Sequence, residues 1–464
     1  MTNYLNAQII TVRDKETNQK LESVIIKSEI PKAITATNSL GEAELKLFKD
    51  SEKILLQHLG YKTLSKSYEE ILHEDLVIYL IPTNISLDQV VVSATKWNQS
   101  NIEIPTKIIS ISPKDIEFQN PQTTADMLSA SGEVFIQKSQ QGGGSPMIRG
   151  FATNRLLISV DGIRMNTAIF RSGNLQNVIS LDNFSLQNVE VLFGPGSVIY
   201  GSDAIGGVMS FYTLQPQFSL NENIFLNGNA VIRNSSANNE LTGHLDFNLG
   251  WKNFAALTSL TYSKFGDAIM GNYGPKEYLR NEFVKRINGE DVVITNSDPL
   301  IQKPTEYSQI NLMQKLSLKT NNNWQFDYGF HYSSTSDYSR FDRLLHYRNG
   351  LPRSTEWYYG PQIWMMNNLN ILNTAQNYFY DNVVLRLAHQ FFEESRHDRD
   401  LNKTIRYDKI EKVNAYSLNL DFAKSLSKTQ NIFYGIEEVF NNVNSTGKDT
   451  DIISANSVNG TARY

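Results

Sequence analysis

The sequence predicts a mainly β protein whose second half forms the first nine or ten strands of an antiparallel transmembrane β-barrel. Beyond Phe218, segments alternate apolar and polar residues with a period of two, and each runs near the ~9–11 residues of a membrane-spanning strand. The links between these segments alternate between short and long, as in outer-membrane barrels. The mean hydropathy of -0.35 and the 22 Tyr and 23 Phe fit this fold, because only alternate residues meet lipid.

Composition and charge argue against several classes of function. The 464 residues exceed one ordinary domain, and a net charge of -5 without a Lys/Arg run makes nucleic acid an unexpected partner. Cysteine is absent, which excludes disulfides and thiolate metal sites. The start, MTNYLNAQIITV, has neither the cationic region nor the apolar core of a signal peptide. Either the protein is not exported or its true start lies upstream.

The first two regions are predicted from short β-rich runs. Residues 1–84 contain AQIITV, SVIIKS, AELKLF, KILLQHL and LVIYLI, punctuated by turn residues such as Asn38, Gly41 and Gly60, which favours a small β-sandwich. Residues 85–101 begin with the β-branched run ISLDQVVVSA and continue without periodicity. We expect a linker that carries one strand.

Residues 102–217 are predicted to form a compact α+β unit. Short strands surround one helical start after Pro121, in PQTTADMLSA. Glycines that permit tight turns are dense here: Gly142, Gly143, Gly144, Gly194, Gly196, Gly201, Gly206 and Gly207.

Residues 218–464 carry the barrel pattern. In ELTGHLDFNL, from Glu240 to Leu249, apolar residues occupy one face of the strand and polar residues the other. The same alternation recurs from Trp324 to Tyr332 and from Tyr416 to Phe422.

The predicted links set the strand count. Short links are expected at 251–253, 320–322, 373–377 and 425–429, and long ones at 266–306, 334–361 and 393–410. Nine or ten strands by Tyr464 compare with about 22 in plugged transporters. Because open edges in lipid would leave backbone groups unpaired, we expect the chain to be a fragment of a larger barrel.

Three stretches resemble the TonB-dependent receptors of bacterial outer membranes. The first is similar to the TonB box, a strand that an inner-membrane energy transducer grips by adding it to its own sheet. It comprises Asp88, Gln89, Val90, Val91, Val92, Ser93 and Ala94. An ordinary core strand is the alternative for VVV alone, and its position just before a plug-like unit favours the TonB box.

The second and third stretches resemble the family's plug domain. MIRGFATNRLLISVDGIRMN carries Arg149-Gly150 and then Asp161-Gly162, a pair that favours a hairpin turn. NVEVLFGPGSVIYGSDAIGGVMSFYT carries the closing motif of the plug: Glu190, Gly194, Pro195, Tyr200, Gly201, Ala204, Gly206 and Gly207. A phosphate-binding glycine loop is excluded, since no Lys follows as in GxxxxGK.

The resemblance implies latches between plug and barrel. Arg149 and Glu190 would be buried against the barrel wall, each with an opposite charge as partner. The family usually has Arg before the Gly-Pro pair, whereas Phe193 stands here, which puts the second latch in doubt. The first region resembles the carboxypeptidase-regulatory-like module, through ESVIIKSE, NSLGEAEL and HLGYKT, and implies no peptidase activity.

No enzyme constellation is found. HExxH, GxSxG and nucleotide fingerprints are absent, so we expect no catalytic residue, metal site or cofactor. His397, Asp398 and Asp400 cluster in a charged run that we interpret as a solvated loop.

The resemblance implies active uptake of a scarce solute across the outer membrane, with residues 1–84 in the periplasm, a TonB-type transducer as partner and lipid around the barrel. The run FRSGNLQNVISLDN…FGPGSVIYGSDAIGGVM is similar to receptors for haem, haemoglobin or other iron carriers. Candidate ligand residues in the long loop are Arg340, Arg343, His346, Arg348, Arg353, Trp357, Tyr358 and Tyr359. A siderophore or cobalamin receptor, a glycan importer and a non-transporting adhesin are the alternatives.

Overall fold

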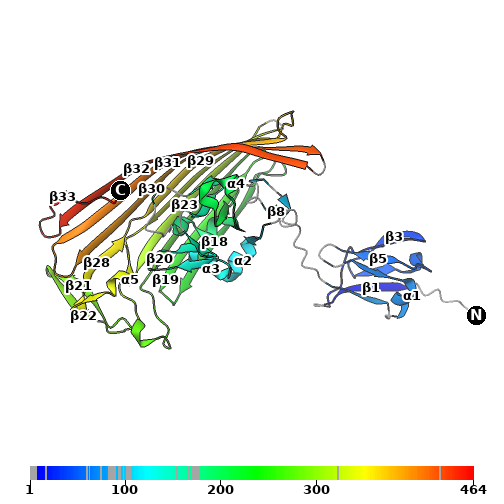
Figure 1. Ribbon diagram of the computed structural model, residues 1–464. Helices are drawn as coiled ribbons and strands as arrows, with labels where there is room; N and C mark the ends of the chain where they lie inside the picture. Colours follow the sequence, from blue (N-terminus) through cyan, green and yellow to red (C-terminus); the bar gives the residue numbers. More distant parts are fainter. Residues whose placement is uncertain are drawn as a thin grey trace, which may run out of the picture. The chain divides into compact units, whose positions relative to one another are not determined.

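The chain forms two compact units, residues 1–89 and 90–464, and each is described by itself. The computed structural model in Figure 1 describes residues 8–15, 18–58, 61, 63–73, 76–81, 90–91, 96–97, 99–100, 106–152, 155–165, 168–169, 177–320, 323–427 and 430–463. None of the described helices is long and apolar enough to cross a membrane.

The first unit is a β-sandwich of two small sheets. One has the order β4-β1-β7 and the other β3-β2-β5-β6. Fully buried Ile10, Ile26 and Leu56 lie in its core. Its elements are β1 (Ile9–Asp14), β2 (Ile25–Glu29), β3 (Lys32–Ala36), β4 (Glu42–Glu44), η1 (Lys46–Phe48), β5 (Ile54–Gln57), β6 (Leu64–Lys66), α1 (Tyr68–His73) and β7 (Val77–Leu80). The carboxypeptidase-regulatory-like assignment and the boundaries at 84, 101 and 217 stay predictions.

The second unit begins with β8 (Val90–Val91) and β9 (Gln99–Ser100), which pair antiparallel. A plug follows, built on a sheet of order β10-β16-β17-β14-β15 and a smaller sheet β11-β12-β13. Its strands are β10 (Ile108–Ile111), β11 (Phe135–Gln137), β12 (Ser145–Ile148), β13 (Phe151–Ala152), β14 (Leu156–Val160), β15 (Ile163–Arg164), β16 (Leu186–Phe193) and β17 (Gly207–Thr213). Its helices are α2 (Pro113–Gln119), α3 (Thr124–Ala130), η4 (Asn177–Ser180), η5 (Asn183–Ser185), α4 (Ser197–Tyr200) and η6 (Ser202–Ala204).

Local sequence explains where the plug's first helices start. Ser112 and Asp115 form a capping box at α2, with Pro113 at the first helical position, and the helix ends at Asn120 in the left-handed region. Thr123 caps α3 by accepting a hydrogen bond from the Asp126 amide. Helix α3 confirms the start predicted after Pro121, whereas α2 was not predicted.

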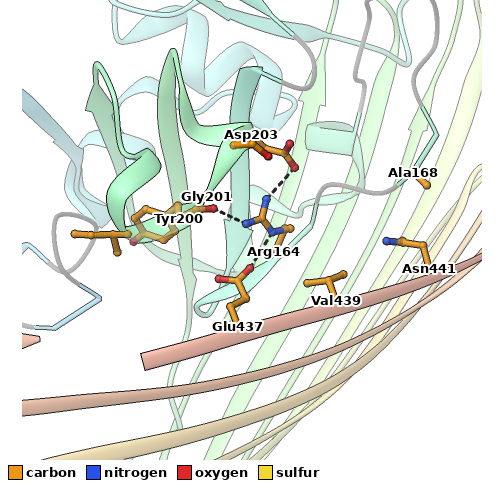
Figure 2. A pocket seen from close by; sticks show the side chains of 10 residues that line it. Arg164, Ala168, Tyr200, Gly201, Asp203, Glu437, Val439 and Asn441 are labelled. Atoms are coloured by element: carbon orange, nitrogen blue, oxygen red, sulfur yellow. Dashed lines mark hydrogen bonds and ion pairs between the residues drawn. The ribbon is translucent and has the colours of Figure 1, made fainter. Parts of the chain in front are cut away.

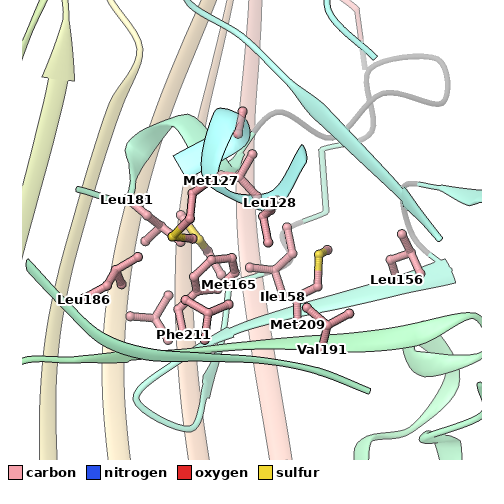
Figure 3. Close-up of a cluster of buried hydrophobic side chains, with 14 of the residues drawn as sticks. Met127, Leu128, Leu156, Ile158, Met165, Leu181, Leu186, Val191, Met209 and Phe211 are labelled. Atoms are coloured by element: carbon pink, nitrogen blue, oxygen red, sulfur yellow. The ribbon is translucent and has the colours of Figure 1, made fainter. Parts of the chain in front are cut away.

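The plug has an apolar core that continues into the wall. Figure 3 shows Met127, Ile158, Met209 and Phe211 converging between α3 and the central sheet, all of them fully buried. The same cluster includes side chains from the large sheet: Trp364, Met366, Ala388, Phe392 and Val413. Plug and sheet therefore share one core at this place.

The large sheet forms a curved wall with the plug on its inner side (Figure 1). Its order is β18-β19-β20-β23-β24-β29-β30-β31-β32-β33, and β28 joins it by pairing with β30. The wall strands are β18 (Phe225–Ser235), β19 (Glu240–Gly250), β20 (Phe254–Phe265), β23 (Tyr307–Lys319), β24 (Trp324–Thr335), β29 (Ile363–Asn373), β30 (Asn382–Asp400), β31 (Ile405–Ser427), β32 (Gln430–Asp451) and β33 (Ser457–Asn459). In the described part of the chain β18 and β33 are edges, so the wall is not closed.

The long links fold into small elements of their own. The link between β20 and β23 contains η7 (Lys276–Tyr278) and the hairpin β21 (Glu282–Ile287) with β22 (Glu290–Thr295). The link between β24 and β29 contains β25 (Tyr338–Ser339), α5 (Phe341–Leu344), β26 (Tyr347–Arg348), β27 (Leu351–Pro352) and β28 (Ser354–Tyr359).

The predicted strand alternation is confirmed, and the structure adds its direction. Along β19 the polar residues, such as Glu240 and Thr242, are fully buried, whereas Leu241 is 56% exposed. The polar face therefore points toward the plug and the apolar face points away from it. This inversion of a soluble protein's pattern is typical of a barrel whose outer face meets lipid.

One predicted link is wrong. Residues 393–410 were expected to form a long loop, but β30 and β31 continue through them and only 401–404 connect the two strands. His397, Asp398 and Asp400 therefore lie on β30, and His397 pairs with Asp408 of β31. Hydropathy did not reveal these ends of the strands, because their charged residues form ion pairs with the neighbouring strand instead of alternating with apolar residues.

Candidate functional site

The candidate functional site is the seam where the plug meets the inner face of the wall. On β18 and β19, Arg233 and Glu240 form a buried ion pair at 2.7 Å between Nη2 and Oε1. Arg233 also donates to the carbonyl oxygen of Pro121 in the plug at 2.8 Å, and Gln122 of the plug donates to Glu240 at 2.7 Å. We call these contacts the β18–β19 seam. It joins the plug to the wall through charge-assisted hydrogen bonds.

A second contact centres on Asp161, at the hairpin turn between β14 and β15. Its Oδ2 lies 2.8 Å from Lys315 Nζ on β23 and 3.6 Å from His331 Nε2 on β24. Thr213 donates to it from both its amide and its hydroxyl. Burial alone would raise the pKa of Asp161, but Lys315 and His331 outweigh burial and hold that pKa below its usual range.

The hairpin turn at Asp161 confirms the prediction made for the Asp-Gly pair. Asp161 and Gly162 have φ values of 50° and 81°, the left-handed conformations of a tight hairpin turn. A Cβ added at Gly162 would lie 2.9 Å from Arg386 Nε of β30. Glycine is favoured here by the positive φ of the turn, and a larger residue would also require the Arg386 side chain to shift.

A third contact is a chain of alternating charges that runs from the wall through the linker to the plug. Arg386 binds Asp421 at 2.7 Å, and Lys96 lies 3.5 Å from Asp421 and 3.1 Å from Glu437. Glu437 also accepts from Arg164 of β15 at 2.9 Å. Figure 2 shows Arg164 continuing the chain to Asp203 of η6, at 2.8 Å. We call these six residues the ion chain.

Two cavities adjoin the ion chain. The larger, of about 460 Å³, is the one drawn in Figure 2, where Arg164, Tyr200, Asp203 and Glu437 lie along one side. The second holds about 220 Å³ between the plug and strands β24, β29 and β30. Its lining includes Lys96, Ser159, Asp161, Tyr200, Tyr212, Asp327, Asn370 and Arg386. We call it the seam cavity.

Of the two predicted latch residues, one is buried and the other is exposed. Glu190 is buried, as expected, and accepts a hydrogen bond from Asn188 at 3.3 Å. Arg149 is exposed in the turn between β12 and β13, so its predicted burial against the wall is wrong. Its guanidinium lies 5.4 Å from the ring centroid of Phe193, the residue that replaces the family's arginine. A cation–π contact within the plug thus occupies the place expected for an ionic latch.

The remaining plug-signature residues gather at one end of the central sheet. The amide of Gly194 donates to the carbonyl of Gly206, and α4 begins directly after Pro195 and Gly196. Tyr200 is buried, and burial raises the pKa of its hydroxyl well above the ordinary value. Gly150 and Gly201 have positive φ, as the tight turns require, whereas Gly207 begins β17, where a Cβ would lie 2.7 Å from the carbonyl oxygen of Leu192.

The predicted ligand loop splits into separate groups. Arg340, Trp357 and Tyr359 come together, with the Arg340 guanidinium 5.3 Å from the Trp357 ring and bonded to the Tyr359 hydroxyl at 2.7 Å. Arg396 of β30 joins them, 5.8 Å from the Trp357 ring, and its buried Nε has no hydrogen-bond partner among the described residues. We call these four residues the cationic aromatic cluster.

The other predicted loop residues lie elsewhere. Tyr358 faces the opposite side of β28 and stacks on His397, with ring centroids 4.6 Å apart. Arg348 and Arg353 lie 3.7 and 3.8 Å from Asp400. Arg343 and His346 are exposed.

A buried ion cluster fixes the β21–β22 hairpin to β28 and β30. Arg399 is fully buried and binds Asp291 of β22 at 2.7 Å and Glu356 of β28 at 2.7 Å. Thr355 and the Asn402 amide also donate to Asp291. Burial alone would raise the pKa of Asp291, but the hydrogen bonds from Arg399, Thr355 and Asn402 outweigh it and lower that pKa from 3.8 to about 2.

This low pKa predicts how the hairpin responds to acid. A carboxylate whose pKa falls on folding stabilises the folded form above its unfolded pKa of 3.8, and that stabilisation disappears as the pH falls through about 2. We expect hydrogen exchange at Glu290–Thr295 to be as slow at pH 5 as at neutral pH, after correction for the intrinsic rate. Protection that is already lost at pH 5 would contradict the assignment of Asp291 as the anchor.

The predicted transducer strand lies largely outside the described residues. Only Val90 and Val91 are placed, in the short strand β8, while Asp88, Gln89, Val92, Ser93 and Ala94 are not. Sequence reasoning missed Lys96, Lys315 and Arg399 as anchors. One signal was available for Lys315, since a lysine on the polar face of a predicted barrel strand needs an acidic partner.

Comparison with known proteins places the plug. Residues 100–208 match the family model described as the TonB-dependent receptor plug domain. The chain is 37% identical over 136 residues to the vitamin B12 transporter BtuB of Vibrio vulnificus strain CMCP6, covering 28% of this chain and 22% of that one. It is 30% identical over 189 residues to the hemin receptor of Yersinia pestis, covering 40% and 26%. The chain thus spans about a quarter of the length of the curated relatives it matches.

The fold has solved counterparts. The ferripyoverdine receptor of Pseudomonas aeruginosa superposes with a TM-score of 0.54 at 12% identity, over 98% of this chain and 57% of that one. At this identity the likeness shows the fold alone, and it extends through the plug and the wall.

Proposed function

This chain belongs to the TonB-dependent receptors, and from that premise we propose that it imports a scarce iron complex across the bacterial outer membrane. Haem or a haem protein is the first candidate for this cargo. The outer loops and the outer end of the plug capture the solute. A TonB-type transducer in the inner membrane pulls on residues 88–94, and the plug shifts to open a path. Residues 1–84 then lie in the periplasm.

The observation that carries this proposal is the way the plug is seated. A wall with an apolar outer face and a polar inner face suits a lipid environment around a filled lumen. Charged contacts such as Asp161 with Lys315 hold the plug at defined points. Charge-assisted hydrogen bonds form only at short distance and in a fixed orientation. After release, the plug can therefore return to the same position.

The ligand class is proposed from the cationic aromatic cluster. Arg340 and Arg396 flank Trp357 and offer guanidinium groups that suit the carboxylates of a large anionic solute. The partly buried ring of Trp357 adds a surface for a flat apolar body. Haem combines both features, and the hemin receptor of Yersinia pestis is one of the relatives.

Cobalamin is the second candidate. The vitamin B12 transporter of Vibrio vulnificus is 37% identical over its matched segment, although that segment is 28% of this chain. Growth that depends on the vitamin rather than on iron would favour this candidate.

The test is growth on defined nutrients after deletion of the complete gene in its native host. With haem or haemoglobin as the sole iron source we expect growth to stop, while growth on a ferric siderophore continues. The wild-type gene and the Val91→Ile variant should restore growth, whereas Val91→Pro should not, because proline removes a backbone donor needed for strand addition.

Each result of that test has a defined meaning. Normal growth of the deletion strain on haem would refute haem as the cargo. Full restoration by Val91→Pro would refute residues 88–94 as the strand that the transducer grips. Arg340→Gln should reduce growth on haem by about tenfold, the loss expected for one charge-assisted contact, and the exposed Arg343→Gln should not.

A further inference from the structure

In the linker that follows the proposed transducer strand, the side chain of Lys96 contacts the wall. Lys96 lies two residues beyond Ala94, and its side chain is 9% exposed. Its Nζ lies 3.1 Å from Glu437 on β32 and 3.5 Å from Asp421 on β31. The ammonium also lies 5.5 Å from the centroid of the Tyr200 ring in the plug. Lys96 thus touches both the wall and the plug at one point.

The ion chain is arranged so that Lys96 can leave it. The two acids that Lys96 contacts each have another cation, Arg386 for Asp421 and Arg164 for Glu437. The loss of an ion pair is most costly when it leaves a buried charge without a partner. Departure of Lys96 avoids this cost, because Asp421 and Glu437 each keep an arginine. Removing Arg386 or Arg164 would instead leave an acid dependent on Lys96 alone.

Lys96 also lines the seam cavity. This cavity of about 220 Å³ has polar side chains on both sides, Ser159 and Asp161 from the plug and Asn370 and Arg386 from the wall, beside the apolar Leu372 and Val384. The Oδ1 atom of Asn370 is buried without a hydrogen-bond partner among the described residues. A buried polar atom left without a protein partner favours a site that water or a polar solute can enter.

The β18–β19 seam has the opposite character. Arg233 and Glu240 are 7% and 0% exposed, and they bind each other and the segment 120–122 directly. The pair belongs to the wall and no part of it is carried on the linker. A pull on the linker therefore acts on the seam that contains Lys96 and spares this one.

We propose that Lys96 is the gate of the seam cavity: when the linker is pulled, Lys96 leaves Asp421 and Glu437, and the solute path opens along β24, β29 and β30. The movement of the linker rests on the proposed function, whereas the gate itself is a property of the closed receptor. The solute path therefore runs along β24, β29 and β30, and the β18–β19 seam stays closed while this path opens.

Residues 1–464 contain no cysteine, so thiol labelling of the full-length receptor in isolated outer membranes gives a direct test once any cysteine outside these residues is replaced by serine. Ser159→Cys reports on the seam cavity, where Ser159 is 3% exposed, and Ser259→Cys on β20 is the matched control at 2% exposed. Each is labelled with a charged maleimide in the wild-type background, in Lys96→Gln and in Lys96→Arg. No transducer or cargo is present, so the outcome does not depend on the growth test above.

We expect Lys96→Gln to speed the labelling of Ser159→Cys by about tenfold, the effect of losing one ion pair of moderate strength, while Ser259→Cys stays slow. Lys96→Arg should keep both sites slow, since it retains the charge. Unchanged labelling of Ser159→Cys in Lys96→Gln would refute the gate. Equal acceleration at both sites would also refute it, because that result indicates general loosening of the plug.

Discussion

Asp161→Asn is expected to weaken the seating of the plug by about 3–5 kcal/mol, the usual cost of leaving a buried charge without its partner. The substitution keeps the shape of the side chain and tolerates the φ of 50°, so the change is confined to charge. Lys315, 6% exposed, would lose its carboxylate at 2.8 Å. The measurement is the urea concentration at which trypsin begins to cut the plug of the intact receptor.

A paired variant separates charge from shape in this experiment. Asp161→Asn combined with Lys315→Met removes both charges and should recover at least half of the loss. Glu222→Gln breaks the exposed pair with Lys252 and should leave the plug unchanged. If Asp161→Asn alone leaves the urea midpoint unchanged, Asp161 is not an anchor of the plug.

Arg399→Met is expected to release the β21–β22 hairpin from the wall, at a cost of about 3 kcal/mol in local stability. The variant keeps an unbranched apolar stem in place of the arginine stem but removes the hydrogen bonds to Asp291, Glu356 and the carbonyl of Lys403. Asp291 would remain buried with only part of its partners. The readout is hydrogen exchange at Glu282–Ile287, which should become faster by about a hundredfold, as that energy implies.

The matched control for this prediction is Arg348→Met. Arg348 is 60% exposed and lies 3.7 Å from Asp400, so its loss should change exchange in the hairpin by less than a factor of about two. Equal exchange in the Arg399→Met variant and the wild type would show that other contacts hold the hairpin. A loop that approaches the solute from outside needs such an anchor, because a free loop of this length would lose entropy on binding.

Patterns of local order predicted much of the fold from the sequence. The period of two located β19, β24 and β31, because alternate side chains of a strand point to opposite faces. The link between β20 and β23 was predicted at its observed bounds of 266–306 by the change from alternating to irregular residues. The Asp161-Gly162 turn followed from the preference of that pair for positive φ.

Pairing between distant segments was not predictable in the same way. With a link predicted at 393–410, β30 was ended too early and β31 was begun too late. The charged residues in 393–400 and 405–410 look solvated until the two segments are seen to pair. Arg149 was expected at the wall from its place in the motif, and it instead lies over Phe193. The substitution at Phe193 was visible in the sequence, but its consequence for Arg149 depended on where two turns of the plug meet.

The sequence by itself determined the fold class, the plug with its glycine turns and the alternation of polar and apolar residues along the wall's strands. These follow from local backbone preferences and from the burial of one face, which short segments encode. Only the tertiary structure decided which charges meet: Lys96 with Glu437, Asp161 with Lys315 and Arg399 with Asp291. The partners in these pairs are separated by more than a hundred residues of chain, and a buried charge requires an opposite partner without specifying which one.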